Sequence, residues 1–324
     1  MSVTSRLEGS EVQNVAGLIV KVCLLATLAT LCSCVPAHRQ LPGELDEVSG
    51  VERIGSVTYM INDSGNPPQL YSLRAPSVDS FNRYGITHTQ QLSLPNVDWE
   101  ALTAYADGTL CLCDIGDNRR ARSGVQFHFV SSEGIQRSIT RVYPDAQSHN
   151  AEACFVMHQQ LFVLTKNRAG LSPLGAQKKL PNLRVAYLYR VDTARQGATT
   201  MVLQDSLELK ASVVTDAAVV QGRSTLAILS YNYGRLLGFL PFTRTYITQI
   251  RLSPQGTFDQ SKRRQRRVRS PFTLTQYEAI VPSPVAFQGE DDAESRTYEV
   301  DIFSERTLWL PARWRRVALP GAHR

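Results

Sequence analysis

The feature that most constrains the fold of this chain is a repeat that runs through most of the sequence. Each copy places an acidic residue directly before an alanine, and Ser49-Gly50 stands in the same slot upstream of the others. The acidic copies are Trp99-Glu100-Ala101, Ala151-Glu152-Ala153, Thr215-Asp216-Ala217 and Tyr277-Glu278-Ala279. Counted from residue 49 to 100, 152, 216 and 278, the spacings are 51, 52, 64 and 62 residues. A period of this length predicts a modular fold in which each repeat packs against its neighbours.

Short apolar segments follow each of the first four copies. The first apolar segment after each motif copy ends in a polar turn, and these segments are 58–66, 110–118, 161–170 and 226–234. Further segments lie at 69–73, 125–130, 184–191 and 245–252, and 87–94 closes the first unit. They are rich in β-branched and aromatic residues and show no sustained helical period, so we expect strands. Four strands per repeat predict an all-β fold, a β-propeller with four-stranded blades. A linear β-solenoid is the alternative, although its repeats are shorter and more regular.

Five motif copies predict five blades, and six remain open if a long interval hides a degenerate blade. The two long intervals are expected to carry extra loops at 169–182 and 253–271. We expect a strand from 41–48 to pair with the last sheet, because a ring must seal its open edges.

The N-terminal segment is expected to be an export signal. Val22–Ser33 is an uncharged apolar run of 12 residues after Lys21, too short to cross a hydrocarbon core of about 30 Å. It ends in Leu31-Cys32-Ser33-Cys34, which resembles a bacterial lipobox. We therefore expect a lipoprotein signal peptide at 1–33, a lipidated N-terminus (acyl chains such as palmitate on Cys34) with a linker at 34–43, and a propeller at 44–324. The protein would be tethered to a cell-envelope membrane, at the outer membrane or the periplasmic face. A short buried helix is the alternative.

Composition supports a globular chain. Of its 324 residues, 43% are hydrophobic and 20% are charged, which excludes a multi-span membrane protein. The net charge of +6 is too small to indicate nucleic-acid binding. Cys111 and Cys113 point the same way on one expected strand, which disfavours a bond between them. A bond from Cys154 to either is open, but we expect three buried thiols.

Equivalent residues of successive blades occupy equivalent places around the ring. Glu100, Glu152, Asp216 and Glu278 are therefore expected to face one another beside the central channel, each followed by a small residue that lets neighbouring strands approach. Carboxylates that converge need a cation, a basic partner or protonation, and calcium accepts such oxygen ligands. Two alternatives stay open: each acid clasps backbone N–H groups of the next blade, or the acids perform acid–base catalysis.

Polar turns predict a ligand-binding rim at one channel mouth. Its candidate residues are Asn62, Asp63, Asp114, Asp117, Asn118 and Lys166. Asn, Asp and Gly also suit tight turns, so a purely structural role remains open. Trp99 could stack on a ligand, although packing between blades is the favoured role.

Several segments resemble a largely uncharacterised family of bacterial envelope lipoprotein β-propellers, distantly similar to calcium-binding and lactonase- or phytase-like propellers. They are ELDEVSG (44–50), INDSGN (61–66), VDWEA (97–101), DIGDN (114–118), NAEA (150–153), LTKNR (164–168) and VTDAA (214–218). The resemblance implies a lipid-anchored propeller that acts as a binding or scaffold module. Its alternative is a calcium-dependent hydrolase in which the ring acids hold the metal and activate water. No motif of a serine hydrolase or a nucleotide-binding protein occurs in the sequence.

A basic run, Lys262–Arg269, is the strongest charge feature of the chain. A solvated loop or a protected edge strand would explain it. Contact with anionic headgroups or lipopolysaccharide phosphates is the functional alternative for a tethered protein, and no nucleic-acid partner is expected.

Overall fold

The computed structural model describes residues 39–74, 83–119, 121–166, 183–210, 212–220, 224–236, 240–268, 275–283, 298–307 and 310–320. The chain divides into two units, Met1–Ala37 and His38–Arg324, and all of these residues belong to the second. Cys34 and the expected signal peptide thus lie outside the described residues, as does the whole loop expected at 169–182. Within the described ranges, no helix has the length and apolar character needed to span a membrane.

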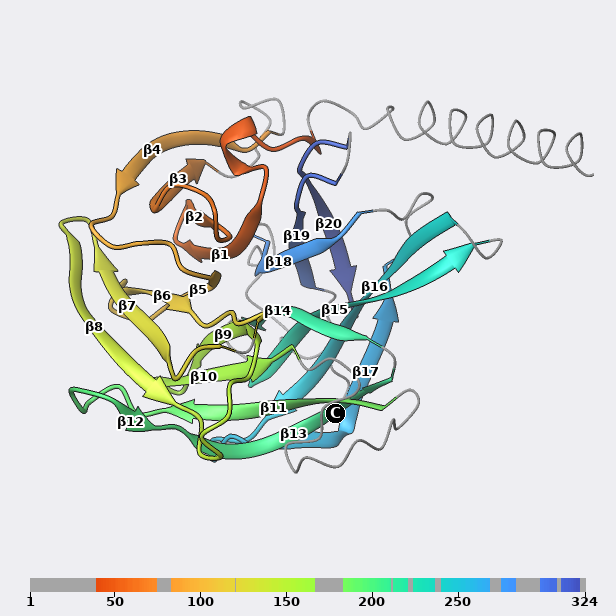
Figure 1. Cartoon of the computed structure of the whole chain (residues 1–324). Coiled ribbons are helices and arrows are strands. Elements are labelled where there is room, and N and C mark those ends of the chain that lie inside the picture. The colour runs from red at the N-terminus through yellow and green to blue at the C-terminus, as the bar shows by residue number, and fades with distance from the viewer. Residues whose placement is uncertain are drawn as a thin grey trace, which may run out of the picture. The chain divides into compact units, whose positions relative to one another are not determined.

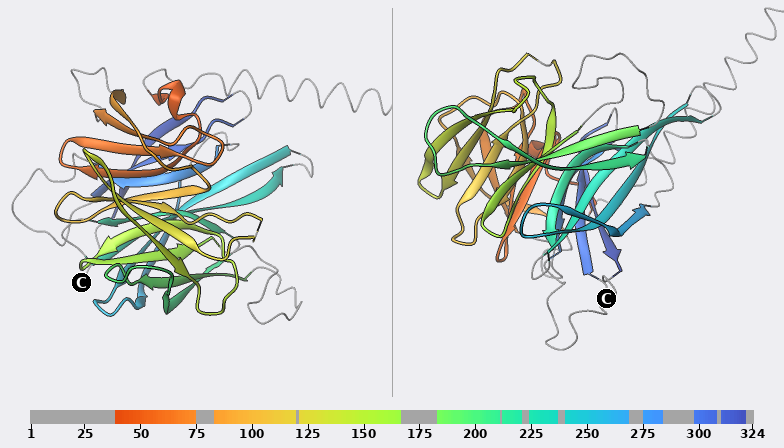
Figure 2. Two further views of the ribbon diagram at one scale, coloured as in Figure 1. Left: turned by 60° about the vertical axis from the view of Figure 1, so that its left-hand side comes forward. Right: turned by 90° about the horizontal axis from the view of Figure 1, so that it is seen from below.

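Five antiparallel sheets form the blades of a five-bladed β-propeller (Figures 1 and 2). Blade 1 contains β1 (Val48–Ile54), β2 (Val57–Asn62), β3 (Gln69–Arg74) and β4 (Gly85–Gln91). Blade 2 contains β5 (Trp99–Ala104), β6 (Leu110–Asp114), β7 (Val125–Ser131) and β8 (Gly134–Val142), extended by the parallel strand β12 (Thr199–Thr200). Blade 3 contains β9 (Ala151–Met157), β10 (Gln160–Thr165), β11 (Leu183–Val191) and β13 (Val202–Lys210). Blade 4 contains β14 (Val213–Val220), β15 (Thr225–Leu236), β16 (Leu240–Leu252) and β17 (Phe258–Arg267). Blade 5 contains β18 (Tyr277–Pro282), β19 (Tyr298–Ser304) and β20 (Arg313–Leu319).

The innermost strands are β1, β5, β9, β14 and β18, and each contacts the next one around the ring. Contact between β18 and β1 closes the circle. The expected five-bladed all-β fold is therefore confirmed. One detail is wrong: residues 258–267 form the outermost strand of blade 4 rather than part of an extra loop.

Apolar clusters fill the interfaces between neighbouring blades. Trp99, which is fully buried, packs in the cluster that joins blades 1 and 2, together with Ile61 and Leu112. Its packing role is therefore confirmed. Ring closure also involves the N-terminal segment, because Leu41 N–H donates to Ala312 O at 2.9 Å and Gln40 bridges to Arg313. The pairing occurs just before the short 3₁₀ helix Gly43–Leu45.

A disulfide bond links Cys113 of β6 to Cys154 of β9, and so joins blades 2 and 3. The expectation of three free thiols is therefore wrong. Cys111 is a buried free cysteine, as its position two residues before Cys113 on one strand predicts. The bond forms because the innermost strand of blade 3 brings Cys154 to the face of blade 2 on which Cys113 lies.

Candidate functional site

A β-bulge interrupts the register between the first two strands of every blade at the repeat motif. A bulge sets two residues against one and re-aims a side chain relative to its neighbours. The residues at the bulge are Ser49, Glu100, Glu152, Thr215 and Glu278. We call these the first ring. The fold thus turns the repeated motif into a set of polar side chains at the start of the innermost strands.

The second strand of each blade supplies a second set. The residues paired just before the bulge are Asn62, Asp114, Thr165, Ser230 and Ser304. The residues that directly follow these five in the chain are Asp63, Ile115, Lys166, Tyr231 and Glu305. We call the five following residues, from Asp63 to Glu305, the second ring. All but Ile115, which packs in the core between blades 2 and 3, line one cavity.

This cavity has a volume of about 200 Å³. Its lining residues are Ser49, Asp63, Glu100, Asn118, Glu152, Lys166, Tyr231, Tyr233, Gln276, Glu278 and Glu305. We call it the acidic chamber, because five of these side chains are carboxylates and one is an ammonium group. It lies at the end of the channel where the innermost strands begin, and every blade contributes to it.

Among the described residues of the lining, the one cationic side chain pairs with a carboxylate of its own blade. Lys166 Nζ lies 2.7 Å from Glu152 Oε1, and both side chains are buried. Asn150 Nδ2 donates to the same oxygen at 2.9 Å. Burial opposes the charged form of Lys166, but Glu152, Glu278 and Glu100 outweigh it and raise its pKa. Lys166 therefore stays protonated and neutralises about one of the five carboxylates.

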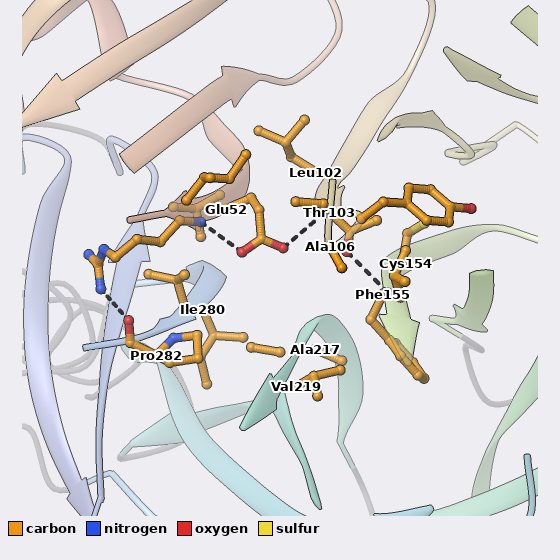
Figure 3. Close-up of a pocket in the computed structure, with 18 of the residues that line it drawn as sticks. Glu52, Leu102, Thr103, Ala106, Cys154, Phe155, Ala217, Val219, Ile280 and Pro282 are labelled. Carbon is orange, nitrogen blue, oxygen red and sulfur yellow. Dashed lines mark hydrogen bonds between the residues drawn. The ribbon is translucent and has the colours of Figure 1, made fainter. Parts of the chain in front are cut away.

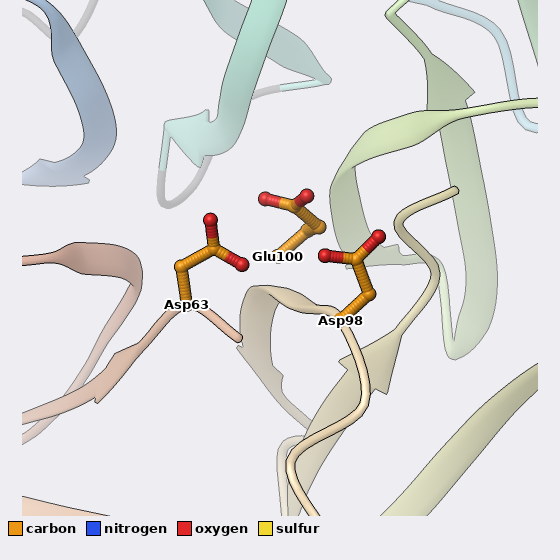
Figure 4. A group of neighbouring side chains, drawn as sticks. All are labelled: Asp63, Asp98 and Glu100. Atoms are coloured by element: carbon orange, nitrogen blue, oxygen red, sulfur yellow. The ribbon is translucent and has the colours of Figure 1, made fainter. Parts of the chain in front are cut away.

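A cluster of three carboxylates lies at the wall formed by blades 1 and 2 (Figure 4). One oxygen from each of Asp63, Asp98 and Glu100 lies within 4.8 Å of the others. Gly116 lies directly against this cluster, since a Cβ placed there would be 2.5 Å from both Asp98 and Glu100. Only glycine lets the 114–118 loop approach so closely. The loop therefore packs against the cluster through Gly116, while its acidic residues, Asp114 and Asp117, are not part of the cluster.

On the adjoining wall, blade 5 contributes Glu278 and Glu305. Glu278 is 7% exposed, and its Oε2 has no hydrogen-bond partner among the described residues. A buried carboxylate oxygen without a partner is costly and indicates a missing ligand or proton. Blade 4 faces this wall with Tyr231 and Tyr233, whose hydroxyl oxygens lie 3.2 Å apart.

The crowding of acids shifts their protonation. Burial, followed by repulsion from Glu152 and Asp63, raises the pKa of Glu100 well above its usual value. Burial and then Glu305 do the same to the pKa of Glu278. Burial raises the pKa of Glu305 to about 7 and that of Asp63 to about 6. Without a cation, the chamber therefore holds protons at neutral pH.

Asp216 does not take the place that the repeat assigned to it. The bulge of blade 4 falls on Thr215, whose hydroxyl donates to Tyr277 O at 2.9 Å, and Asp216 takes the position held by glycine or alanine in the other blades. Its carboxylate accepts N–H groups from Ala217 at 2.7 Å and from Ile280 of the next blade at 2.8 Å. Asp216 thus clasps two blades together and does not line the chamber.

Three of the rim residues also lie outside the lining. Asn62 Nδ2 donates to Glu44 O at 2.7 Å, and Asp114 pairs with Arg122 at 2.5 Å. Asp117 accepts the N–H groups of residues 121 and 122 and organises its own turn. The structure therefore brings together Asp63, Asn118 and Lys166 of the rim residues, with Glu100, Glu152 and Glu278 of the ring.

Sequence reasoning missed six residues as candidates for the site. They are Ser49, Asp98, Tyr231, Tyr233, Gln276 and Glu305. Glu305 carried a usable signal, because it follows Ser304 as Lys166 follows Thr165 in blade 3. Asp98 lies two residues before a recognised acid, and Ser49 stood in the motif slot itself.

A second cavity, of about 410 Å³, lies where the innermost strands end (Figure 3). Most of its lining residues are apolar, although polar atoms form about half of its wall. Glu52 is the acidic group of its lining and accepts backbone N–H groups from Arg53 at 2.7 Å and Ala104 at 3.1 Å. It thus joins blade 1 to blade 2, as Asp216 joins blade 4 to blade 5. Burial raises the pKa of Glu52 to about 7.

Comparison with known proteins bears on the fold alone. No protein-family model matches the sequence, and no curated protein matches it. Among solved structures, the chain is similar to glutaminyl cyclase of Myxococcus xanthus, with 11% identity, a TM-score of 0.42, and coverage of 87% of this chain and 95% of that one. It is also similar to the computationally designed Ika8 protein, with 9% identity, a TM-score of 0.33, and coverage of 86% and 98%.

Proposed function

We propose that this protein is a binding module held at a bacterial envelope membrane by a lipid on Cys34, with a hard divalent cation such as calcium in the acidic chamber. The observation that carries the proposal is the charge balance of the chamber. Five lining carboxylates and the adjacent Asp98 face one ammonium group. A divalent cation would relieve this repulsion.

The donor set suits a hard cation. Calcium takes six to eight oxygen ligands in flexible geometry, and every candidate ligand here is an oxygen. Asp63, Asp98 and Glu100 would form one side of the site. The Oε2 atom of Glu278, which has no hydrogen-bond partner among the described residues, is a further oxygen of the same chamber. Repulsion from Asp63 contributes to the raised pKa of Glu278, so the two carboxylates act on the same space. Because Lys166 already neutralises Glu152, we place the cation against blades 1, 2 and 5.

Calcium titration of chelator-treated protein tests the proposal. We expect calcium to raise Tm, since a ligand at 100 times its Kd stabilises the folded state by about 2.7 kcal/mol. Asp98→Asn keeps the shape of the side chain and should weaken calcium binding at least tenfold by calorimetry. Asp107→Asn is the matched control, because Asp107 is exposed in the turn after β5 and should leave binding unchanged. Equal calcium affinity in Asp98→Asn and the unmodified protein, or no calcium binding at all, would contradict the metal site.

The anchor needs a separate test. Cys34→Ser should release the protein from membranes into the soluble envelope fraction, because stable anchoring depends on the buried acyl chains. Ser33→Ala keeps a small residue beside the attachment site and serves as the control. Membrane association that survives Cys34→Ser would remove the anchor from the proposal.

Glu305 favours a second candidate function, a calcium-dependent hydrolase of lactonase or phytase type. Its pKa of about 7 suits a general acid or base, and it lines the same chamber as the proposed cation. Lactone, ester and phosphoester substrates should then be turned over with calcium, and Glu305→Gln should abolish turnover while calcium still binds. If all of these substrates persist unchanged, the binding module stands alone.

A further inference from the structure

Strand β17, the outermost strand of blade 4, carries the basic run on an open edge. Among the described strands it pairs with β16 alone, so its other edge presents backbone groups outward. It is ten residues long, and Lys262, Arg264, Arg266 and Arg267 on it are exposed, with Arg263 half-buried. We call these five residues the basic edge.

The charges of the basic edge point to both faces of the sheet. Arg263 Nη1 donates to Glu208 O of β13 at 2.7 Å, toward blade 3. Arg266 Nη1 donates to Ala318 O of β20, toward blade 5. Residues 264–267 pair regularly with β16 and alternate in direction, so Arg267 lies on the face opposite to Arg266. A register shift interrupts this pairing at residues 260–263, and Lys262 lies in that bulged part of the strand. The ion pairs among the described residues include none of these four.

Charges of one sign at this spacing repel each other. Residues two apart on a strand lie about 6.8 Å from each other, inside the Debye length of about 8 Å at physiological salt. The same repulsion prevents a second copy of β17 from pairing with this edge, because like charges directly opposite are destabilising. An acidic strand would instead place an opposite charge beside each basic side chain.

The same molecule shows that an outermost strand of this propeller can accept another strand. In blade 2, Thr199–Thr200 pairs in parallel with β8, at Arg141 and Val142, and extends that sheet to five strands. The corresponding edge of blade 4 is longer and has no such addition among the described strands.

We propose that the basic edge docks an extended acidic segment of a partner protein, which adds to blade 4 as a fifth strand. Main-chain hydrogen bonds to the open edge supply affinity, and alternating Asp or Glu side chains supply specificity on both faces. A flat anionic membrane is less suited, because it can meet the charges of only one face of the strand at a time.

The test uses the full chain and a labelled ten-residue peptide that alternates Glu with Val, measured by fluorescence anisotropy at 0.15 M salt. A second peptide of the same charge has proline in place of each Val, which removes backbone donors and prevents strand pairing. We expect the proline peptide to bind at least tenfold more weakly. We also expect Lys262→Glu/Arg267→Glu to weaken binding of the first peptide at least tenfold.

The control variant Arg74→Glu/Arg190→Glu changes the net charge equally at exposed residues of blades 1 and 3, and should bind like the unmodified protein. Hydrogen exchange should show new protection of residues 258–267 when the first peptide is bound. Equal binding of the two peptides would overturn strand addition. So would binding to phosphatidylglycerol vesicles, lost in Lys262→Glu/Arg267→Glu, without binding to either peptide.

Discussion

Replacement of Glu305 by Gln should stabilise the calcium-free protein at alkaline pH and have no effect at acid pH. Burial, followed by repulsion from Asp63 and Glu152, raises the pKa of Glu305 from 4.5 to about 7. The folded state therefore binds the Glu305 proton more tightly than the unfolded state does. The protein therefore loses stability through this group as pH rises above 4.5, and the loss is complete above about pH 7.

The magnitude follows from the size of the shift. Each pKa unit corresponds to about 1.36 kcal/mol, so a shift from 4.5 to about 7 costs the folded state about 3 kcal/mol at pH 8. Glutamine fills nearly the same volume and carries no charge, and it avoids this cost. Since Glu305 is partly exposed and solvent screens its charge, we expect Glu305→Gln to raise the free energy of unfolding by about 2 kcal/mol at pH 8.

The assay is urea unfolding of the two proteins with excess chelator between pH 4 and pH 8.5. Glu133→Gln, in the exposed turn between β7 and β8, controls for loss of a surface charge and should give a flat difference. In saturating calcium the gain should shrink, because the cation stabilises the ionised form. If Glu305→Gln is less stable than the unmodified protein at pH 8, or if the difference does not change with pH, the crowding of charges in the chamber has been misjudged.

Three further changes test other parts of the structure. Lys166→Met should destabilise the protein by about 3–5 kcal/mol at pH 7 in chemical unfolding, because it leaves Glu152 buried without its partner. Asp216→Asn should cost about 1–3 kcal/mol, because the two oxygens that accept the N–H groups of Ala217 and Ile280 would be reduced to one, and should leave calcium affinity unchanged in calorimetry. Cys113→Ser/Cys154→Ser should lower the free energy of unfolding by about 4 kcal/mol, because the unfolded chain is no longer restricted by a bond between residues 41 positions apart. Reducing agent should then have no further effect on Tm.

The fold was predictable because one structural device recurs in every blade. In four of the five blades the bulge combines a polar residue with a small residue directly after it, and this pair is recognisable although the rest of the repeat differs between blades. Gly50 shows the packing side of the motif, since a Cβ there would lie 2.8 Å from the backbone of Ala101 and Leu102. Strand order then follows from the short connections within each unit.

The site was only partly predictable, because the motif fixes a position to within one residue while the bulge decides which side chain faces the chamber. In blade 4 the acid lies one place late, so Asp216 became a clasp and Thr215 took the ring position. Glu305 was hidden for a different reason: the second strand of blade 5 begins 20 residues after Glu278 (278 to 298), about twice the interval of the other blades, so the sequence spacing does not place Glu305 beside Asp63 and Lys166. The disulfide escaped prediction because it joins two blades, a contact that no spacing within a blade encodes.

The two rings also explain why the unneutralised carboxylates of the chamber lie on one side only. Blade 3 places an acid in the first ring and a base in the second, and the two neutralise each other across β9 and β10. Blade 4 contributes Tyr231 in place of a charge. The unpaired carboxylates therefore come from blades 5, 1 and 2, which are neighbours because β18 contacts β1 and β1 contacts β5.

A cation bound there would sit off the propeller axis, and it would use little of the space. The chamber measures about 200 Å³, whereas one water molecule needs only about 15 Å³ on such a measure. Tyr231 and Tyr233 line the chamber on blade 4, and Tyr233 is 61% exposed. The asymmetry of charge thus leaves an accessible space beside the cation site, bordered by hydroxyl groups, where the oxygen atoms of a larger ligand could reach the ion.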